Sequence, residues 1–146
     1  MVDQKREAQL RDAIEQFYFA YRAFTARPDR ILEQRGLGRV HHRILYFVGR
    51  NSGLSVNELL NTLGVSKQAL NAPLRQLIEM KLIATQIASH DKRVKKLMLS
   101  DTGKKLETQL TQTQMKHLGD VFDEHGSKAE RAWLDLMKAM PTLTES

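Results

Sequence analysis

The sequence predicts a mainly α-helical fold that carries one small β-hairpin. Apolar residues recur every three to four positions through most of the chain, which is the period of an amphipathic helix. Serine residues stand just before several of these stretches, where helix N-caps are expected. Between residues 82 and 99 the apolar residues instead alternate on either side of a charged segment, Asp91-Lys92-Arg93. The predicted class is therefore α+β, dominated by helices.

Two helices are predicted in the N-terminal third. The first covers residues 5–27 and is expected to stop at Pro28, and the second covers about 39–51. Five aromatic residues lie between Phe17 and Phe24, more than a surface helix of a small domain needs. They indicate either a subunit interface or the roof of a pocket, with ordinary core packing as the alternative.

A helix-turn-helix pattern follows. Ser55 and Glu58 form a capping box for a short helix that runs to about residue 63. Gly64 supplies the tight turn between the two helices, and Ser66 caps a helix predicted at about 67–80.

The helix at 67–80 has an apolar back and a polar front. The apolar positions that share one face are Leu70, Leu74, Leu77 and Ile78. The polar front and its flank carry Gln68, Asn71 and Arg75. Such side chains can make paired hydrogen bonds to base edges in a major groove, although a simple solvated face is the alternative. Ser66 and Lys67 at the helix start are expected to contact phosphates.

Pro73 departs from this pattern because it lies in the middle of the predicted helix. Proline there removes a backbone hydrogen bond and clashes with the preceding turn. We therefore expect the helix either to kink or to restart at Pro73.

A hairpin is predicted next, with strands at 82–88 and 94–99 and a tip formed by residues 89–93. Lys95 and Lys96 lie on the return strand. The 40 residues 66–105 hold nine Lys and Arg against three Asp and Glu, whereas the rest of the chain holds 14 of each sign. The whole basic excess therefore lies in one segment, as expected of a phosphate-binding surface.

Two further helices close the chain. Ser100 caps a helix at about 101–124. Ser127 and Glu130 read as a second capping box for a last helix that is expected to end at Pro141.

Composition narrows the function classes. With 146 residues the chain is expected to form a single domain, and the absence of cysteine excludes disulfides, thiol redox sensing and thiolate zinc sites. We expect no membrane span and no signal peptide, and hence a cytoplasmic protein. No arrangement typical of a catalytic site is apparent, so we expect no enzyme, no metal and no cofactor. The neighbouring His41 and His42 point too far apart on their helix to share a metal easily.

The segment from 36 to 103 resembles the multiple-antibiotic-resistance regulator (MarR) family of bacterial transcription factors. The residues that carry the resemblance are Leu54-Ser55-Val56-Asn57-Glu58-Leu59, Leu63-Gly64-Val65-Ser66, Leu77-Ile78-Glu79-Met80-Lys81-Leu82-Ile83, Asp91-Lys92-Arg93, Leu99-Ser100 and Gly103. The resemblance implies a winged helix-turn-helix module at 36–103, with dimer-interface helices at 5–35 and 104–146 around it in the single domain 1–146.

The same resemblance implies a homodimeric repressor or activator on a pseudo-palindromic operator in double-stranded DNA, with repression the expected sign. Each recognition helix would enter a major groove and each wing the neighbouring minor groove. Arg93 would be placed at the minor groove and paired to Asp91, with Lys92, Lys95 and Lys96 at phosphates. A solvated surface ion pair is the alternative for Asp91 and Arg93.

Members of the family often bind small aromatic or phenolic acids between the dimer helices and the reader module. The side chains expected to line such a pocket here are Phe17, Tyr18, Tyr21, His41, His42 and Tyr46. Ordinary core and interface packing is the alternative for these residues. The alternative for the whole chain is a winged helix used for protein interaction or RNA binding.

Overall fold

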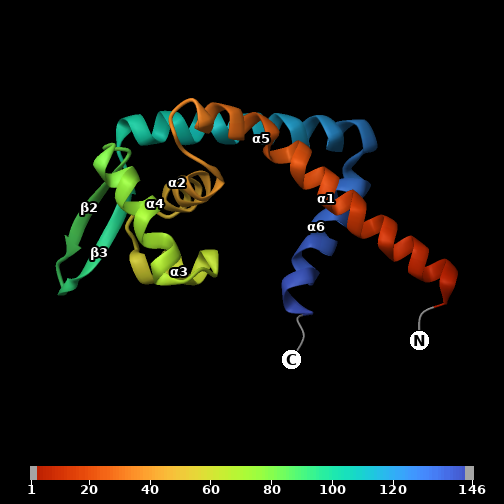
Figure 1. Ribbon diagram of the computed structural model, residues 1–146, viewed down its shortest axis with the longest axis horizontal. Helices are drawn as coiled ribbons and strands as arrows, with labels where there is room; N and C mark the ends of the chain where they lie inside the picture. Colours follow the sequence, from red (N-terminus) through yellow and green to blue (C-terminus); the bar gives the residue numbers. More distant parts are fainter. Residues whose placement is uncertain (1–2, 144–146) are drawn as a thin grey trace.

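The computed structural model describes residues 3–143, and this part of the chain holds six helices and a small antiparallel sheet that lies at one edge of the molecule (Figure 1). The predicted fold class, mainly α with a β-hairpin wing, is confirmed. The elements in chain order are α1 Gln4–Glu33, α2 Arg39–Arg50, β1 Leu54–Ser55, α3 Val56–Leu63, α4 Lys67–Glu79, β2 Ile83–Ala88, β3 Asp91–Leu99, α5 Asp101–His125 and α6 Ser127–Thr142.

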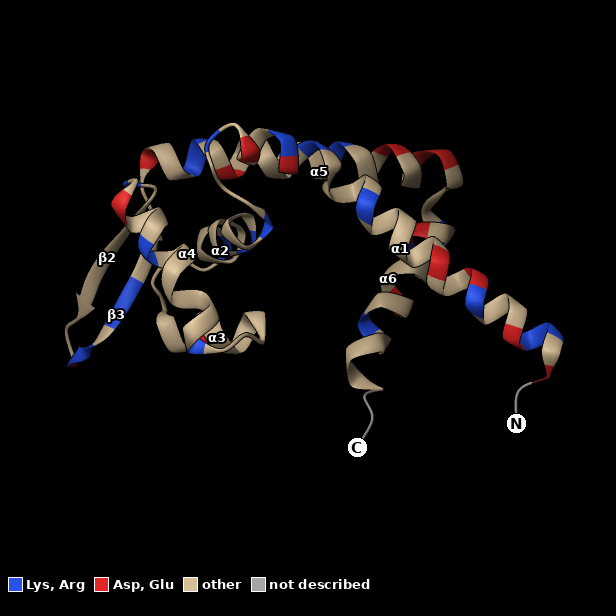
Figure 2. Ribbon diagram, viewed as in Figure 1, with Lys and Arg blue, Asp and Glu red and all other residues tan. Residues whose placement is uncertain are grey.

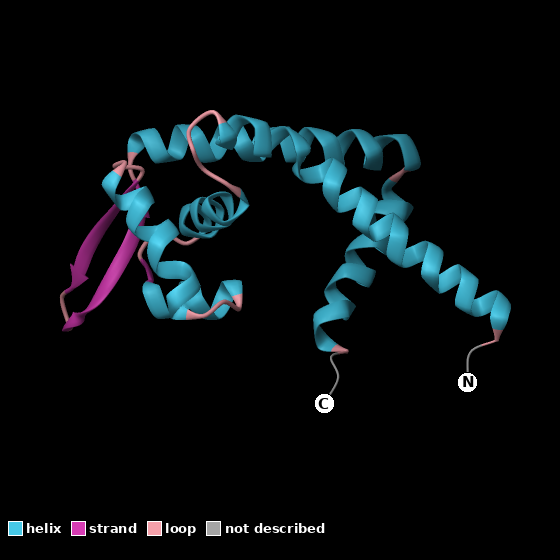
Figure 3. Cartoon of the chain, viewed as in Figure 1, coloured by secondary structure: helices cyan, strands magenta, loops and turns pink. Residues whose placement is uncertain are grey.

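The long helix α5 spans the molecule and joins its two ends (Figures 1 and 3). At one end α2, α3, α4 and the hairpin pack together near the start of α5. At the other end α5 packs against α1, whose N-terminal part extends away from the first group, and against α6, which folds back below α5. None of the helices within residues 3–143 combines the length and the apolar character that crossing a bilayer requires.

A single hydrophobic core lies beneath the helix-turn-helix end of the molecule. It takes residues from the end of α1, from α2, α3, α4 and the sheet, and from the first turns of α5. No described residue of α6 is buried, and α1 buries only Thr25, Pro28 and Leu32. The helices at the far end therefore leave their apolar stripes open.

The sheet has three strands in the order β1-β3-β2, and the first of them was not predicted. Leu54 pairs with Leu97, and Ser55 with Lys96. A strand of two residues has no alternation that a pattern can detect, so only the tertiary pairing defines it.

The prediction that Pro28 stops the first helix is wrong. α1 continues through it to Glu33. The Pro28 ring and the Leu32 side chain are both buried, and this burial offsets the lost hydrogen bond to the Phe24 carbonyl. Pro141 likewise lies inside α6, which ends at Thr142, one residue beyond the predicted stop.

Pro73 lies within one continuous helix, so the predicted alternative of a restart is wrong. Leu70, Leu74 and Leu77, which lie before and after Pro73, are buried and hold both halves of α4 against the core. Ala69, whose carbonyl loses its partner to Pro73, is exposed, so water can hydrogen-bond this oxygen.

The second predicted capping box, Ser127 with Glu130, is also wrong. Gly126 takes the N-cap position with φ 96°, and Ser127 is already helical. Because glycine tolerates a positive φ, the chain reverses at Gly126 and starts α6 at once, before Ser127 can act as a cap. The capping boxes and caps at Ser55, Ser66 and Ser100 are confirmed. The predicted interface segment 104–146 ends in residues 144–146, which, like residues 1–2, lie outside the described part of the chain.

Candidate nucleic-acid interface

α4, the helix predicted to read DNA, is held by its apolar back and presents its polar front to solvent. The Ser66 hydroxyl oxygen accepts a hydrogen bond from the Ala69 N–H at 3.1 Å and fixes the helix start. Gly64 adopts the left-handed conformation, φ 66°, that the turn between α3 and α4 requires. All five residues predicted to contact DNA from this helix are exposed, namely Ser66, Lys67, Gln68, Asn71 and Arg75.

The capping box at the start of α3 anchors the other helix of the pair. Ser55 Oγ accepts from the Glu58 N–H at 3.1 Å, and the Glu58 carboxylate accepts from the Ser55 N–H at 3.0 Å. Hydrogen bonding of the Glu58 carboxylate to the backbone N–H and then the side chain of Ser55 lowers the pKa of Glu58, and the positive charge of Lys96 lowers it further. Lys96 of the wing therefore lies close enough to the start of α3 to affect it electrostatically.

The wing differs from the predicted hairpin at its tip. β3 begins at Asp91, so the turn is Ser89-His90 alone and not residues 89–93. The register explains this, because Ala88 pairs with Asp91 whereas Ile87 pairs with Lys95. Residues 92–94 of β3 therefore have no pairing partners in β2 and form a bulge. Because a bulge interrupts the alternation of a strand, the sequence pattern predicted a loop there.

Asp91 closes this bulge through Arg93. The Asp91 carboxylate accepts from the Arg93 backbone N–H at 2.9 Å and from the guanidinium Nε and Nη2, each at 3.2 Å. The side-chain and then the backbone hydrogen bonds from Arg93 lower the pKa of Asp91, so the carboxylate is charged at neutral pH. The Arg93 side chain is 90% exposed and keeps the rest of its donors free for a ligand.

The predicted phosphate contacts of the wing fall on both of its faces. Lys95 and Lys96 are consecutive in β3, so their side chains leave opposite faces of the hairpin. Lys95 pairs with the exposed Ile87 of β2, and Lys96 pairs with Ser55 of β1. Figure 2 shows basic residues along β3 and at the hairpin tip. Lys92 and Arg93 lie in the bulge near the hairpin tip, whereas Lys96 lies toward the start of α3.

The turn at Lys81 and Leu82 fixes the position of the wing relative to α4. Lys81 adopts a left-handed conformation, φ 61°, and the Leu82 N–H bonds the Leu77 carbonyl at 3.0 Å. Ser100 Oγ donates to the Lys81 carbonyl at 2.6 Å and also accepts from the Gly103 N–H. A Cβ on Gly103 would overlap the Leu82 carbonyl oxygen, so the close approach needs glycine.

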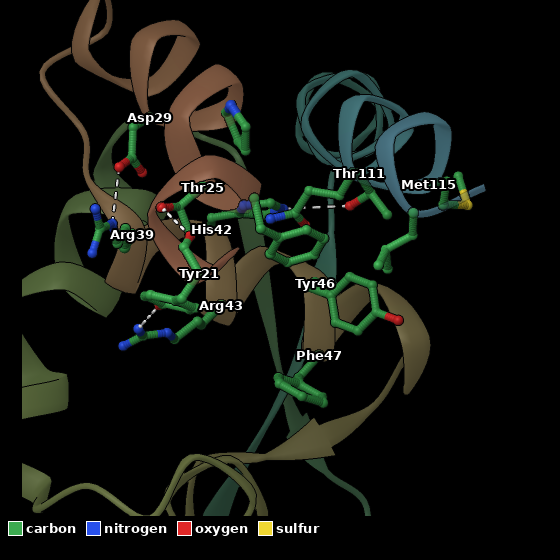
Figure 4. A pocket seen from close by; sticks show the side chains of 14 residues that line it. Tyr21, Thr25, Asp29, Arg39, His42, Arg43, Tyr46, Phe47, Thr111 and Met115 are labelled. Atoms are coloured by element: carbon green, nitrogen blue, oxygen red, sulfur yellow. Dashed lines mark hydrogen bonds and ion pairs between the residues drawn. The ribbon is translucent and has the colours of Figure 1, made fainter. Parts of the chain in front are cut away.

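A cleft of about 310 Å³ lies between α1, α2 and α5 (Figure 4). Of the six residues predicted for a ligand pocket, Tyr21, His42 and Tyr46 line it. Phe17 instead lines an apolar groove against α5 and α6. Tyr18 is exposed beneath the Arg22 guanidinium, and His41 faces α4.

Charged residues that sequence reasoning missed complete this cleft. Arg39 Nε bonds the Asp29 carboxylate at 2.9 Å and its guanidinium carbon lies 5.4 Å from the Tyr21 ring centre. Arg43 Nη2 donates to Tyr21 Oη at 2.7 Å. These partners lie 10 and 22 residues apart along the chain, on separate helices, and no local spacing signals them.

His42 forms the polar floor of the cleft. Its Nε2 lies 3.4 Å from Thr111 Oγ1, and burial lowers its pKa, while the negative charges of Glu107 and Asp29 partly oppose this. His42 is therefore neutral at neutral pH. The cleft combines one neutral imidazole, several aromatic rings, the Arg39 guanidinium paired with Asp29, and the Arg43 guanidinium, which can bind a negatively charged group of an aromatic ligand.

Comparison of the amino-acid sequence with known proteins identifies relatives of this chain. The model of the MarR family matches residues 35–94. The chain is 41% identical over 134 residues to the HTH-type transcriptional regulator PetP of Rhodobacter capsulatus, covering 92% of this chain and 81% of PetP. The chain belongs to the MarR family. It is therefore a helix-turn-helix transcriptional regulator of this family.

Solved structures of MarR-type regulators share this fold. The transcriptional regulator SlyA superposes with a TM-score of 0.76 at 15% identity, covering 90% of this chain and 92% of SlyA. A variant of S. aureus MepR bound to an oligodeoxyribonucleotide superposes with a TM-score of 0.59 at 21% identity, covering 90% of this chain and 98% of that one.

Proposed function

We propose that this MarR-family protein binds double-stranded DNA sequence-specifically, as a homodimer on a pseudo-palindromic operator, and represses transcription. The observation that carries the proposal is the exposed polar front of α4 beside a basic, bulged wing. The oligodeoxyribonucleotide bound to the related MepR variant supports DNA as the ligand. Occupancy of an operator can block transcription by itself, so repression requires no further surface.

Base choice belongs to α4 in this proposal. Gln68, Asn71 and Arg75 are exposed, and their amide and guanidinium groups match the donor and acceptor patterns of base pairs in the major groove. Ser66 and Lys67 at the N-terminus of α4 hold phosphates, where the helix dipole favours negative charge.

Grip on the backbone belongs to the wing. Arg93 enters the minor groove with its guanidinium oriented by Asp91. Lys92 and Lys95 reach phosphates beside it, and Lys96 reaches a phosphate nearer α3. Binding is then strongly salt-dependent, because each neutralised phosphate releases counterions.

The two ends of the chain form the dimer interface. Large apolar side chains stand exposed on both terminal helices, with Ile14 of α1 68% and Leu136 of α6 66% exposed. Together with the apolar groove of about 580 Å³ between α1, α5 and α6, they form a surface that a second copy would cover. On this basis 36–103 is the DNA-reading module, and the segments 5–35 and 104–146 supply the interface within one domain.

A small aromatic ligand in the cleft would release the operator. Tyr21, His42 and Tyr46 lie where α1 of the interface meets α2 of the reader. A ligand there acts only if its affinities for the DNA-competent and DNA-incompetent states differ. Phenolic acids are the first compounds to test, since Arg43 can exchange its bond with Tyr21 for one to a carboxylate.

Selection from a random duplex pool tests the proposal. We expect the wild-type protein to enrich a pseudo-palindromic sequence, with affinity that falls steeply as salt rises. Structured RNA of equal length serves as the competitor. Preference for RNA, or binding that ignores duplex sequence, would instead favour an RNA-binding or protein-interaction module.

A further inference from the structure

A hydrogen-bonded network ties the recognition helix to the loop that follows α1. His41 Nδ1 accepts from the Gly38 N–H at 2.9 Å, and His41 Nε2 lies 2.9 Å from Gln76 Oε1. Gln76 Nε2 in turn donates to the Gly36 carbonyl at 3.4 Å. Two side chains thus join three elements: the α1–α2 loop, the first turn of α2, and α4.

Only one set of hydrogen-bond directions satisfies every contact. A neutral imidazole has one donor and one acceptor nitrogen. Nδ1 is the acceptor because the Gly38 N–H can only donate, so Nε2 carries the proton and donates to the Gln76 amide oxygen. The Gln76 amide nitrogen is then free to donate to Gly36. The network is therefore directional, and His41 at 9% exposure is shielded from competing water.

The network touches α4 beside its base-reading front. Gln76 follows Arg75 directly and lies between the buried Leu74 and Leu77. Apolar packing of these leucines fixes how deep α4 lies but leaves rotation and sliding less restrained, because dispersion contacts have little directionality. Hydrogen bonds from Gln76 supply that directional restraint.

The other end of the network touches the interface half of the molecule. Gly36 and Gly38 lie in the loop that leaves α1, and the next residue, Arg39, is paired to Asp29 of α1. These contacts therefore fix the orientation of α4 relative to α1, the helix proposed to form the dimer interface.

We infer that His41 and Gln76 are positioning residues, which set the recognition helix relative to the dimer helices and so select the half-site spacing of the operator. The inference rests on the proposed function. In a dimer the two recognition helices must enter grooves about one helical turn apart, roughly 34 Å. A small rotation of α4 in each protomer shifts the side chains that contact bases. Loss of the hydrogen bonds between His41 and Gln76 should therefore weaken the preference for one half-site spacing before it weakens DNA binding itself.

Two substitutions remove the link from either side. Gln76→Met keeps a helix-forming side chain of similar length and removes the amide. His41→Asn keeps an acceptor for the Gly38 N–H but is too short to reach Gln76. Gln109→Met makes the first change on the exposed face of α5 and serves as the control.

The readout is spacing preference, which loss of stability alone would not change. The wild-type protein first selects its duplex from a random pool, and the affinities for this duplex and for versions with one base pair inserted or deleted at the centre are then compared. We expect Gln76→Met and His41→Asn each to lose about fivefold of the preference for the selected spacing, with unchanged affinity for non-specific duplex. The double variant should lose no more than Gln76→Met alone, because that change already removes both hydrogen bonds of Gln76.

Three results would overturn the inference. They are a spacing preference in folded Gln76→Met equal to that of Gln109→Met, additive losses in the double variant, and a His41 ring that nitrogen NMR finds protonated at Nδ1. The NMR measurement needs no DNA, and His41→Asn replaces Gln76→Met if the latter does not fold. A wild-type protein that selects no duplex, or binds all spacings equally, would instead contradict the proposed function.

Discussion

Asp91 holds Arg93 through three hydrogen bonds inside the bulge of the wing, one from the backbone and two from the guanidinium. The two residues are only two positions apart, so the guanidinium is oriented by its own strand and not by the core. The contact leaves the wing basic at its tip and gives Arg93 one preferred direction. The first prediction follows from this arrangement.

Arg93→Ala should weaken operator binding by at least about tenfold, since it removes a charged contact. The melting temperature should stay unchanged, because an exposed ion pair contributes little to stability. Fluorescence anisotropy at moderate salt and a thermal melt test the two parts. Arg11→Ala on the exposed surface of α1 is the control, and an unaltered dissociation constant for Arg93→Ala would remove the wing from the mechanism.

Arg75→Ala and Lys95→Ala should have different effects on DNA binding, the first on base discrimination and the second on affinity for any sequence. Loss of Arg75 should cost about 1 to 3 kcal/mol of discrimination against a wrong base pair. Loss of Lys95 should weaken all sequences alike and reduce the slope of log affinity against log salt by about one. Competition binding with operator and scrambled duplexes separates these effects. Equal losses of both kinds in both variants would refute the division between base contacts and phosphate contacts.

Leu136→Glu should convert the dimer to monomers. The side chain is 66% exposed on α6, so the change costs the monomer little but places a charge in the proposed interface. Sedimentation velocity checks the oligomeric state. Ile87→Glu introduces the same charge on an exposed apolar position of the wing and should leave the dimer intact. A dimeric Leu136→Glu would place the interface elsewhere.

Gly103→Ala should lower the free energy of unfolding by about 3 kcal/mol, because the new Cβ would overlap a backbone oxygen that cannot rotate away. Gly119→Ala on the same helix is the control. Beyond the neighbouring residues and backbone of its own helix, no described atom would lie within 4 Å of its Cβ, and the change should stabilise by about 0.5 to 1 kcal/mol. Urea unfolding measures both, and equal effects would contradict the close approach at Gly103.

Acidification should destabilise the protein through His42. Burial lowers the pKa of His42 in the folded state, whereas the unfolded chain takes up the proton near its ordinary value of 6.5. The unfolded state therefore binds more protons between the two pKa values, and the free energy of unfolding falls as pH drops through this window. His42→Gln should reduce the loss of melting temperature between about pH 7.5 and 5.5. The exposed His125→Gln should not, and identical acid sensitivity in wild type and His42→Gln would exclude His42 as the cause.

Several features followed directly from sequence because they depend on neighbours along the chain. The caps at Ser55, Ser66 and Ser100 and the turn at Gly64 involve contacts within a few residues, and all were predicted correctly. The apolar back of α4 was also predicted, since helical period alone places Leu70, Leu74 and Leu77 on one face.

Other features were decided by contacts between distant residues. Pro28 continues α1 because its ring is buried against other helices, and two-residue β1 exists only through its pairing with β3. The cleft gathered half of the predicted pocket residues and added Arg39 and Arg43, whose partners lie on α1. The same holds for the network between His41 and Gln76, which are 35 residues apart.

The sequence by itself determined the order of the six helices and the hairpin, the helix starts at Ser55, Ser66 and Ser100, the basic segment and the residues that face outward from α4. Tertiary structure alone decided the bulge of the wing, the composition of the cleft and the link between α2 and α4. The physical reason is range: capping and periodicity act within a turn of helix, whereas burial and cross-strand pairing depend on which distant segments the core brings together.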